Sequence, residues 1–308
     1  MTETVRVTAE KIKRLEVQGA RNVAVAAIKA LQTLAEQSKA ESKTAFMGEL
    51  KEARGILFAS RETEPLMRNA VQWIITQTQN CSSQKLDEVK EMVSSNVSLF
   101  LQNLEASREL TAEIGAKRIR DGMLVFTHCH SSTVTRMIAK AKAEGKQFSV
   151  ICTETRPAYQ GRITAREMVE LGVQTMFIVD SAARSYMGDV DLVVVGADAI
   201  TSEGNVVNKI GTSAIAVLAN EARKPFYVVS ELLKFDPETL YGAYERIEQR
   251  SPSEVWREAP QQLSVRNPAF DVTPSRYIHG IICEEGIIPP QTIVETVCRS
   301  YPWVFKGT

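Results

Sequence analysis

Hydrophobic and polar positions follow one period in the first part of the chain. Over residues 86–104, for example, apolar side chains recur at spacings of three and four, and glycine and proline are scarce. This spacing is typical of amphipathic helices. It predicts a helical N-terminal domain over residues 1–121, with Pro65 in the first turn of one helix and the Ser82-Ser83 pair as the cap of a long one.

A second period begins after Gly122, where short apolar and β-branched runs alternate with segments of helical pattern. Most runs are continuously hydrophobic, which is typical of parallel strands covered by helices on both faces. Residues 122–308 are therefore predicted to form a doubly wound, mostly parallel α/β domain. The polar, proline-containing stretch between Phe235 and Asp271 predicts an irregular excursion. The predicted strands are Met123–Thr127, Phe148–Cys152, Thr175–Val179, Leu192–Val195, Phe226–Val229 and Ile278–Ile282.

Composition narrows the class of protein. The 308 residues include 37 Lys+Arg and 37 Asp+Glu, so the formal net charge is zero, which argues against a general nucleic-acid coat protein. No run of about 18 apolar residues occurs, and the N-terminus lacks a secretory pattern, so we expect a cytoplasmic protein without membrane spans. The five cysteines are scattered and never form a Cys-x-x-Cys pair, which argues against a disulfide framework or a zinc ribbon.

Candidate chemistry is expected where strands end, because ligands of open parallel sheets bind at the carboxyl ends of the strands. The first run leads through Thr127-His128-Cys129-His130 into a helix, so Cys129 lies near a helix N-terminus, where the dipole favours a thiolate. Cys129 is then a base or nucleophile, or else a small buried side chain. His128 and His130 have no third ligand at suitable spacing, which favours hydrogen bonding over a metal site.

A carboxyl group occupies the corresponding position after the fourth run. Asp198 follows the small residues Gly196 and Ala197, which let a ligand approach, and an apolar setting there would keep its carboxyl protonated. A protonated carboxyl can donate a proton, so Asp198 and Cys129 form a possible acid and base pair on neighbouring strand ends. The alternative is that Asp198 caps a helix.

A phosphate group is the ligand that the next motif favours. Residues 208–213, Asn-Lys-Ile-Gly-Thr-Ser, are expected to open a helix, where free backbone N–H groups, the helix dipole and Lys209 attract an anion. Lys234 adds a second positive charge unless it is a solvated surface residue. Neither a Walker loop nor a Gly-x-Gly-x-x-Gly motif is present, which argues against nucleotide hydrolysis and dinucleotide reduction. We therefore expect a small phosphorylated ligand.

These motifs together resemble a known superfamily, that of the initiation-factor 2B regulatory subunits and the sugar-phosphate isomerases. The resemblance covers nearly the whole chain and is strongest to its archaeal ribose-1,5-bisphosphate isomerase branch. The motifs that carry it are Thr-His-Cys-His-Ser (127–131), Thr-Glu-Thr-Arg-Pro-x-x-Gln-Gly (153–161), Asp-Ser-Ala-Ala (180–183), Gly-Ala-Asp (196–198), Asn-Lys-Ile-Gly-Thr (208–212) and Asn-Pro-Ala-Phe-Asp-Val-Thr-Pro (267–274).

The resemblance implies a fold and a reaction. The fold is an N-terminal helical domain followed by a Rossmann-like domain, in a homo-oligomer that is a dimer or a trimer of dimers. The reaction is an aldose-ketose isomerisation of α-ribose 1,5-bisphosphate to ribulose 1,5-bisphosphate in nucleoside monophosphate salvage, with Cys129 as base and Asp198 as acid. No metal, nicotinamide or flavin cofactor, nucleic-acid partner or membrane is implied.

The resemblance also implies which residues bind the sugar phosphate. One departure stands out, because the isomerases usually read Arg-Gly-Ala-Gly where this chain has Gln at position 18 and Arg at position 21. Arg21 is therefore either a replacement for the missing charge or an exposed helical arginine. The implied binding residues are Gln18, Gly19, Ala20, Arg21, Arg61, Ser131, Ser132, Thr133, Gln160, Asn208, Lys209 and Lys234.

Two other branches of the superfamily remain as alternatives. The 5-methylthioribose-1-phosphate isomerases usually have Asn-Thr-Gly after Thr-His-Cys, where this chain has His130-Ser131-Ser132, so the bisphosphate is favoured. The non-catalytic regulatory subunits typically lack both the cysteine and the aspartate. The presence of Cys129 and Asp198 together therefore favours an enzyme.

Overall fold

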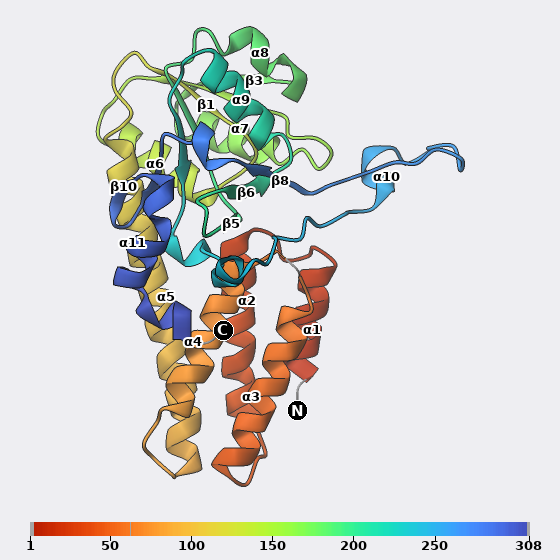
Figure 1. Ribbon diagram of the computed structural model, residues 1–308, viewed down its shortest axis with the longest axis vertical. Coiled ribbons are helices and arrows are strands. Elements are labelled where there is room, and N and C mark those ends of the chain that lie inside the picture. Colours follow the sequence, from red (N-terminus) through yellow and green to blue (C-terminus); the bar gives the residue numbers. More distant parts are fainter. Residues whose placement is uncertain (1–2, 62, 307–308) are drawn as a thin grey trace.

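Five helices form the first part of the molecule and pack beneath an α/β domain (Figure 1). The computed structural model describes residues 3–61 and 63–306. Pro65 begins its helix as predicted, since its missing N–H falls among the N–H groups that no helix pairs. The predicted Ser82-Ser83 cap is wrong, because Lys85 holds the cap position of the long helix. The helices are α1 (Glu3–Lys13), α2 (Ala20–Gln37), α3 (Lys43–Phe58), α4 (Pro65–Gln79) and α5 (Leu86–Ala116).

The second part is a seven-stranded sheet with the order β10-β9-β7-β4-β1-β2-β3, and neighbouring strands are parallel except for β9 and β10. All six predicted strands occur, and the predicted fold class is confirmed. The strands are β1 (Leu124–Thr127), β2 (Ser149–Thr153), β3 (Gln174–Ile178), β4 (Leu192–Val195), β7 (Phe226–Val229), β9 (Gly280–Cys283) and β10 (Gly286–Ile288).

Helices cover the sheet, but not evenly. At the edge strand β3, Met176 and Phe177 are both 44% exposed, so this strand is an exception to the expected burial on both faces. The helices of this part are α6 (Ser132–Ala143), α7 (Gly161–Glu170), α8 (Ala183–Tyr186), α9 (Thr212–Glu221), α10 (Pro252–Val255) and α11 (Ile293–Ser300).

The strand order creates a crevice at one place in the sheet. From β1 the chain runs outward through β2 to β3 and then returns to β4, which pairs with the other side of β1. The connections after β1 and β4 therefore leave the sheet in opposite directions. Such a switch point opens a ligand crevice at the carboxyl ends of the two strands.

A small antiparallel sheet lies across this crevice. It has the order β5-β6-β8 and consists of β5 (Ala199–Ile200), β6 (Val206–Lys209) and β8 (Phe270–Thr273). These strands have two to four residues each and follow a turn or an irregular stretch, so they leave little periodicity in the sequence. Asn208 and Lys209 consequently end a strand rather than open a helix.

The predicted excursion after Phe235 is confirmed as largely irregular. It contains the short helix α10 and an isolated bridge between Gln249 and Pro268. In Figure 1 the part around α10 extends away from the rest of the molecule.

One hydrophobic core joins the two parts. Leu31 of α2 and Leu66 of α4 belong to the same buried cluster as Phe126 of β1 and Phe226 of β7. The division into domains 1–121 and 122–308 stays a prediction, and residues 1–2 and 307–308 at its outer limits lie outside the described residues. None of the helices in the described chain combines the length and the apolarity needed to cross a bilayer.

Candidate active site

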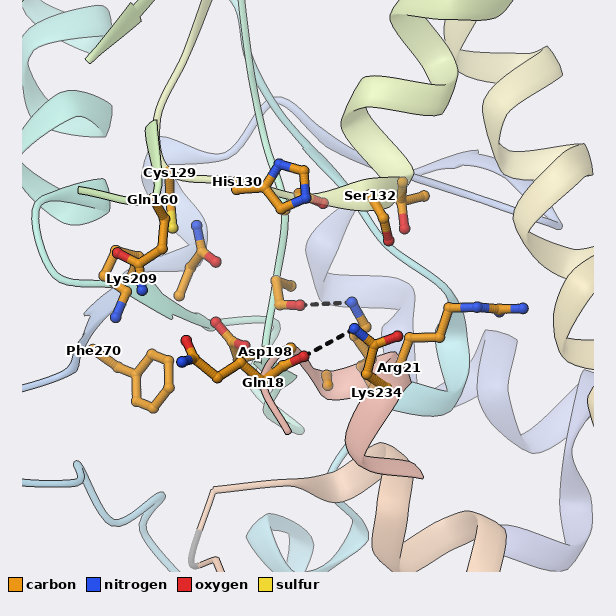
Figure 2. A pocket seen from close by; sticks show the side chains of 18 of the residues that line it. Gln18, Arg21, Cys129, His130, Ser132, Gln160, Asp198, Lys209, Lys234 and Phe270 are labelled. Carbon is orange, nitrogen blue, oxygen red and sulfur yellow. Dashed lines mark hydrogen bonds between the residues drawn. The ribbon is translucent and has the colours of Figure 1, made fainter. Parts of the chain in front are cut away.

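A cavity of about 520 Å³ opens at the switch point. Its walls come from the strand ends, the start of α2, the small sheet and the excursion, and Figure 2 labels ten of the residues that line it. Every residue predicted for catalysis or binding lines this one cavity. These are Gln18, Gly19, Ala20, Arg21, Arg61, Cys129, Ser131, Ser132, Thr133, Gln160, Asp198, Asn208, Lys209 and Lys234.

The backbone at Cys129 is held in an unusual conformation. Its φ of 67° lies in the left-handed region, which costs a residue with a side chain about 1–3 kcal/mol. The Cys129 N–H donates to Thr155 Oγ1 at 2.9 Å, and the Cys129 carbonyl accepts from Thr164 Oγ1 at 2.8 Å. The Thr155 N–H in turn donates to Asp180 at 2.8 Å. These contacts fix the direction in which the thiol enters the cavity.

The thiol of Cys129 is protonated at neutral pH. Burial raises its pKa to about 11, and the positive charge of Lys209 is the largest effect that opposes the rise. Ser131 is the N-cap of α6 and its side chain accepts from Val134 N–H, so the helix start lies beyond Cys129. The expectation that the helix dipole keeps the thiol ionised is therefore wrong for the unliganded protein, because desolvation is the stronger effect.

Asp198 lies just beyond the end of β4, the neighbour of β1. Its backbone N–H donates to the Val207 carbonyl at 2.9 Å, and β5 begins at the next residue. The alternative role as a helix cap is therefore wrong. The approach of this strand end to α6 is close: a Cβ at Gly196 would lie 2.6 Å from Ser131 Oγ, so only glycine fits there.

The free N–H groups at the N-terminus of α9 bind a carboxylate of the protein itself. The Asp271 carboxylate accepts from the Gly211 N–H at 2.8 Å and from the Ser213 N–H at 3.1 Å. The prediction that these amides bind phosphate is wrong, because β8 brings this carboxylate to the helix start. Lys209 and Asn208 enter the cavity from β6 instead, and each is only 6% exposed.

Two further cations of the cavity are buried. Lys234 is 6% exposed, donates to the Ala197 carbonyl at 2.8 Å and lies 3.5 Å from Glu231, so the alternative of a solvated surface lysine is wrong. Arg61 is also 6% exposed and pairs with Glu64 at 2.8 Å and with Glu248 at 3.3 Å. Burial raises the pKa of Glu64 to about 8, although the Arg61 charge opposes this.

Gln18 and Arg21, where this chain differs from the isomerase motif, lie at the start of α2 and line the cavity. Gly19 is the N-cap with a φ of 83°, and no side chain caps this helix. Arg21 donates to Glu105 at 2.5 Å and to the Leu104 carbonyl at 3.3 Å, and in Figure 2 its side chain is directed away from Cys129. Burial, with the nearby Arg108, lowers the pKa of Arg21. Arg21 is thus partly buried and paired rather than an exposed helical arginine.

The remaining predicted residues provide polar atoms to the cavity wall. Ser132 begins α6, and Thr133 donates to Glu231 at 3.4 Å. Gln160 has a buried Oε1 without a hydrogen-bond partner among the described residues, which leaves it available to a donor from a ligand.

The two histidines differ in their surroundings. His128 is buried, contacts Thr153 Oγ1 at 2.6 Å and the Ile210 carbonyl at 2.9 Å, and burial lowers its pKa. His130 lines the cavity and contacts Thr164 at 3.2 Å. Both histidines lie beyond Thr127, the last residue of β1. Within the described residues, no group of three or more His, Cys, Asp or Glu side chains is placed to hold a metal ion.

Sequence reasoning missed three prominent residues of the wall: Arg108, Arg250 and Phe270. Arg108 lies on a helix that carries no motif, and Arg250 lies in the irregular excursion. Phe270 was present in a quoted motif but received no role. Its ring lies 5.1 Å from Lys209 Nζ and 5.8 Å from the Arg61 guanidinium.

Comparison with known proteins gives the family. A model described as the initiation factor 2 subunit family matches residues 16–290, and the chain belongs to this family. The chain is 42% identical to ribose 1,5-bisphosphate isomerase from Thermococcus kodakarensis, over 97% of this chain and 95% of that protein.

Two solved structures have the same fold. One is translation initiation factor eIF-2B from Pyrococcus horikoshii OT3, with a TM-score of 0.81, 31% identity, and coverage of 94% of this chain and 98% of that one. The other is 5-methylthioribose 1-phosphate isomerase from the same organism, with a TM-score of 0.80, 31% identity, and coverage of 96% and 87%.

Proposed function

We propose that this protein is a sugar-phosphate aldose-ketose isomerase that converts α-ribose 1,5-bisphosphate to ribulose 1,5-bisphosphate. One observation carries the proposal: Cys129 and Asp198 follow two paired strands, β1 and β4, in a cavity surrounded by buried cations. The 42% identity to an isomerase of that name supports the choice of substrate.

The substrate sets a particular problem. A furanose 1-phosphate has no free aldehyde, so the bond between carbon 1 and the ring oxygen must break while the phosphate stays attached. In the first step the Cys129 thiolate removes the proton from carbon 2, and those electrons form a double bond to carbon 1 as the bond between carbon 1 and the ring oxygen breaks. The departing ring oxygen takes a proton from the Asp198 carboxyl.

The second step completes the isomerisation. The enol intermediate carries a hydroxyl on carbon 2, whose proton passes to the Asp198 carboxylate as the ketone forms. Carbon 1 takes back the proton held by the Cys129 thiol. Both side chains regain their starting states, so the reaction consumes no oxidant, reductant or external proton.

The cations have two tasks in this proposal. They pair with the substrate phosphates, for which lysine and arginine are suited. Lys209 also opposes part of the effect of burial on Cys129, whose pKa is about 11, and so favours the thiolate that the first step needs. Arg250 opposes the rise as well.

The proposal extends to context and assembly. We place the reaction in nucleoside monophosphate salvage in the cytoplasm, with ribulose 1,5-bisphosphate passed to a carboxylase. We also propose a homo-oligomer, a dimer or a trimer of dimers, which the exposed apolar residues of the edge strand β3 favour. Light scattering at several protein concentrations measures the particle mass.

Phosphorus and proton NMR tests the reaction. The protein is incubated separately with α-ribose 1,5-bisphosphate and with methylthioribose 1-phosphate, without added metal. Formation of ribulose 1,5-bisphosphate from the first alone is the expected result. Conversion of the second alone would assign the chain to the methylthioribose branch, and conversion of neither would favour a non-catalytic regulatory subunit.

A further inference from the structure

Arg250 lies in the irregular excursion, yet it reaches the cavity. The Arg250 N–H donates to the Asn267 carbonyl at 2.9 Å, and the Ala269 N–H donates to the Glu248 carbonyl at 2.8 Å. This short antiparallel pairing anchors residues 248–250 beside the start of β8. In extended backbone alternate side chains share a face, so Glu248 and Arg250 point the same way.

One carboxylate serves two guanidinium groups at this place. Glu248 Oε1 lies 3.3 Å from Arg250 Nε, and Glu248 Oε2 lies 3.3 Å from Arg61 Nε. The Arg250 side chain is 7% exposed, and its Nε has no hydrogen bond of good geometry within the described part of the chain. Both arginines therefore keep donor capacity that Glu248 does not use.

Positive charge exceeds negative charge in this corner of the cavity. Lys209 joins the two arginines there, since Phe270 contacts both Lys209 and Arg61. Burial raises the pKa of Glu64, the other carboxyl beside Arg61, to about 8, which favours its neutral form. Glu248 is shared between Arg61 and Arg250. Buried cations without equal counter-charge are costly unless a ligand supplies it.

We propose that Arg250 binds a phosphate group of the substrate together with Arg61 and Lys209, and that Glu248 holds the two guanidinium groups in place. A guanidinium matches two phosphate oxygens at once, and a phosphomonoester supplies the missing negative charge. The excursion is then part of the substrate site. This inference rests on the proposed function for the identity of the sugar bisphosphate.

The test compares Arg250→Gln, Arg250→Lys and the control Arg257→Gln, whose residue is exposed on the same excursion. Calorimetry measures the Kd of ribulose 1,5-bisphosphate, and steady-state kinetics measures KM and kcat for α-ribose 1,5-bisphosphate. Loss of a charge-assisted contact predicts a rise of about 10- to 100-fold in Kd and KM for Arg250→Gln, with kcat changed less. Arg250→Lys should recover part of the affinity, and Arg257→Gln should match the wild type.

The results separate the two proposals. Wild-type binding without isomerisation, with weaker binding by Arg250→Gln, would support the phosphate site and overturn the proposed reaction. Isomerisation with an unchanged KM in Arg250→Gln would do the reverse. If Arg250→Gln does not fold, a crystal structure of the wild type with ribulose 1,5-bisphosphate decides: a phosphate oxygen within hydrogen-bond distance of the Arg250 guanidinium supports the assignment, and its absence there overturns it.

Discussion

The two sides of the cavity are built in different ways. On one side, which we call the floor, Cys129 and Asp198 follow paired strands of a buried sheet. On the other side, the cation wall, Arg61, Lys209 and Arg250 come from the helical part, the small sheet and the excursion. The floor presents one thiol and one carboxyl group, whereas the cation wall presents positively charged side chains. In the proposed function, the floor supplies the acid and the base, and the cation wall binds the phosphate groups.

Replacement of the floor base should have the largest effect. Cys129→Ser should lower kcat by about 1,000-fold or more, because a hydroxyl is a far weaker acid than a thiol and does not form the base. The Kd for the bisphosphate should stay near the wild-type value. Steady-state kinetics measures kcat, and calorimetry measures the Kd. The control is Cys298→Ser, at an exposed cysteine. Near-normal turnover would exclude Cys129 as the base.

Replacement of the floor acid is expected to rank second. Asp198→Asn keeps the shape of the side chain but holds no transferable carboxyl proton, so kcat should fall by about 100- to 1,000-fold. Binding should change little in comparison. The exposed Asp189→Asn is the matched control. A selective rise in KM would instead make Asp198 part of the binding wall.

The cation wall should respond in affinity. Lys209→Met removes a buried positive charge and should raise KM by about 10- to 100-fold. Because Lys209 opposes the rise in the pKa of Cys129, alkylation of that thiol by iodoacetamide at pH 8 should also become slower. Mass spectrometry measures the labelled fraction over time, with the exposed Lys29→Met as control. Unchanged labelling and unchanged KM would remove Lys209 from both tasks.

A smaller effect should show how much the orientation of Cys129 contributes to turnover. Thr155→Val removes the hydroxyl that accepts from the Cys129 N–H, a contact that contributes about 1 kcal/mol. We expect kcat to fall about fivefold, since that energy holds a left-handed backbone in place, and KM to stay unchanged. Thr175→Val on the edge strand is the control. Equal kinetics of the two variants would show that Cys129 keeps its orientation without this contact.

The last prediction concerns stability rather than turnover or affinity, namely its dependence on pH near the cation wall. The pKa of Glu64 is about 8 in the folded protein against an ordinary value of 4.5, so the folded state binds the proton more tightly. The stability that this contributes is present below pH 4.5 and is lost as the pH rises to about 8. Glu64→Gln should therefore lose less stability over this window than the wild type. Thermal melts at pH 5 and pH 8.5 measure the change in Tm between the two pH values, with the exposed Glu41→Gln as control. An equal change in Tm for Glu64→Gln and the wild type would count against the raised pKa.

Much of the fold and of the candidate site can be predicted from the sequence. Continuous apolar runs predicted six of the seven strands of the main sheet, and Pro65 marked a helix start, because both signals depend on nearest neighbours along the chain. Cys129 and Asp198 were identified from strand-end motifs, and Lys209 from a motif that was expected to open a helix. Arg250 was not, since nothing around it is periodic, and the two- to four-residue strands of the small sheet are too short to show a period.

The sequence by itself determined the class of fold, the order of its elements and the kinds of reactive group at the strand ends. Only the tertiary structure decided the environment of those groups. Burial raises the pKa of Cys129 more than the helix start that follows it could lower it. Asp271, 60 residues away from Gly211, accepts the hydrogen bond of the Gly211 N–H, which would otherwise attract phosphate. Desolvation and contacts between distant residues depend on packing in three dimensions, which local sequence patterns do not record.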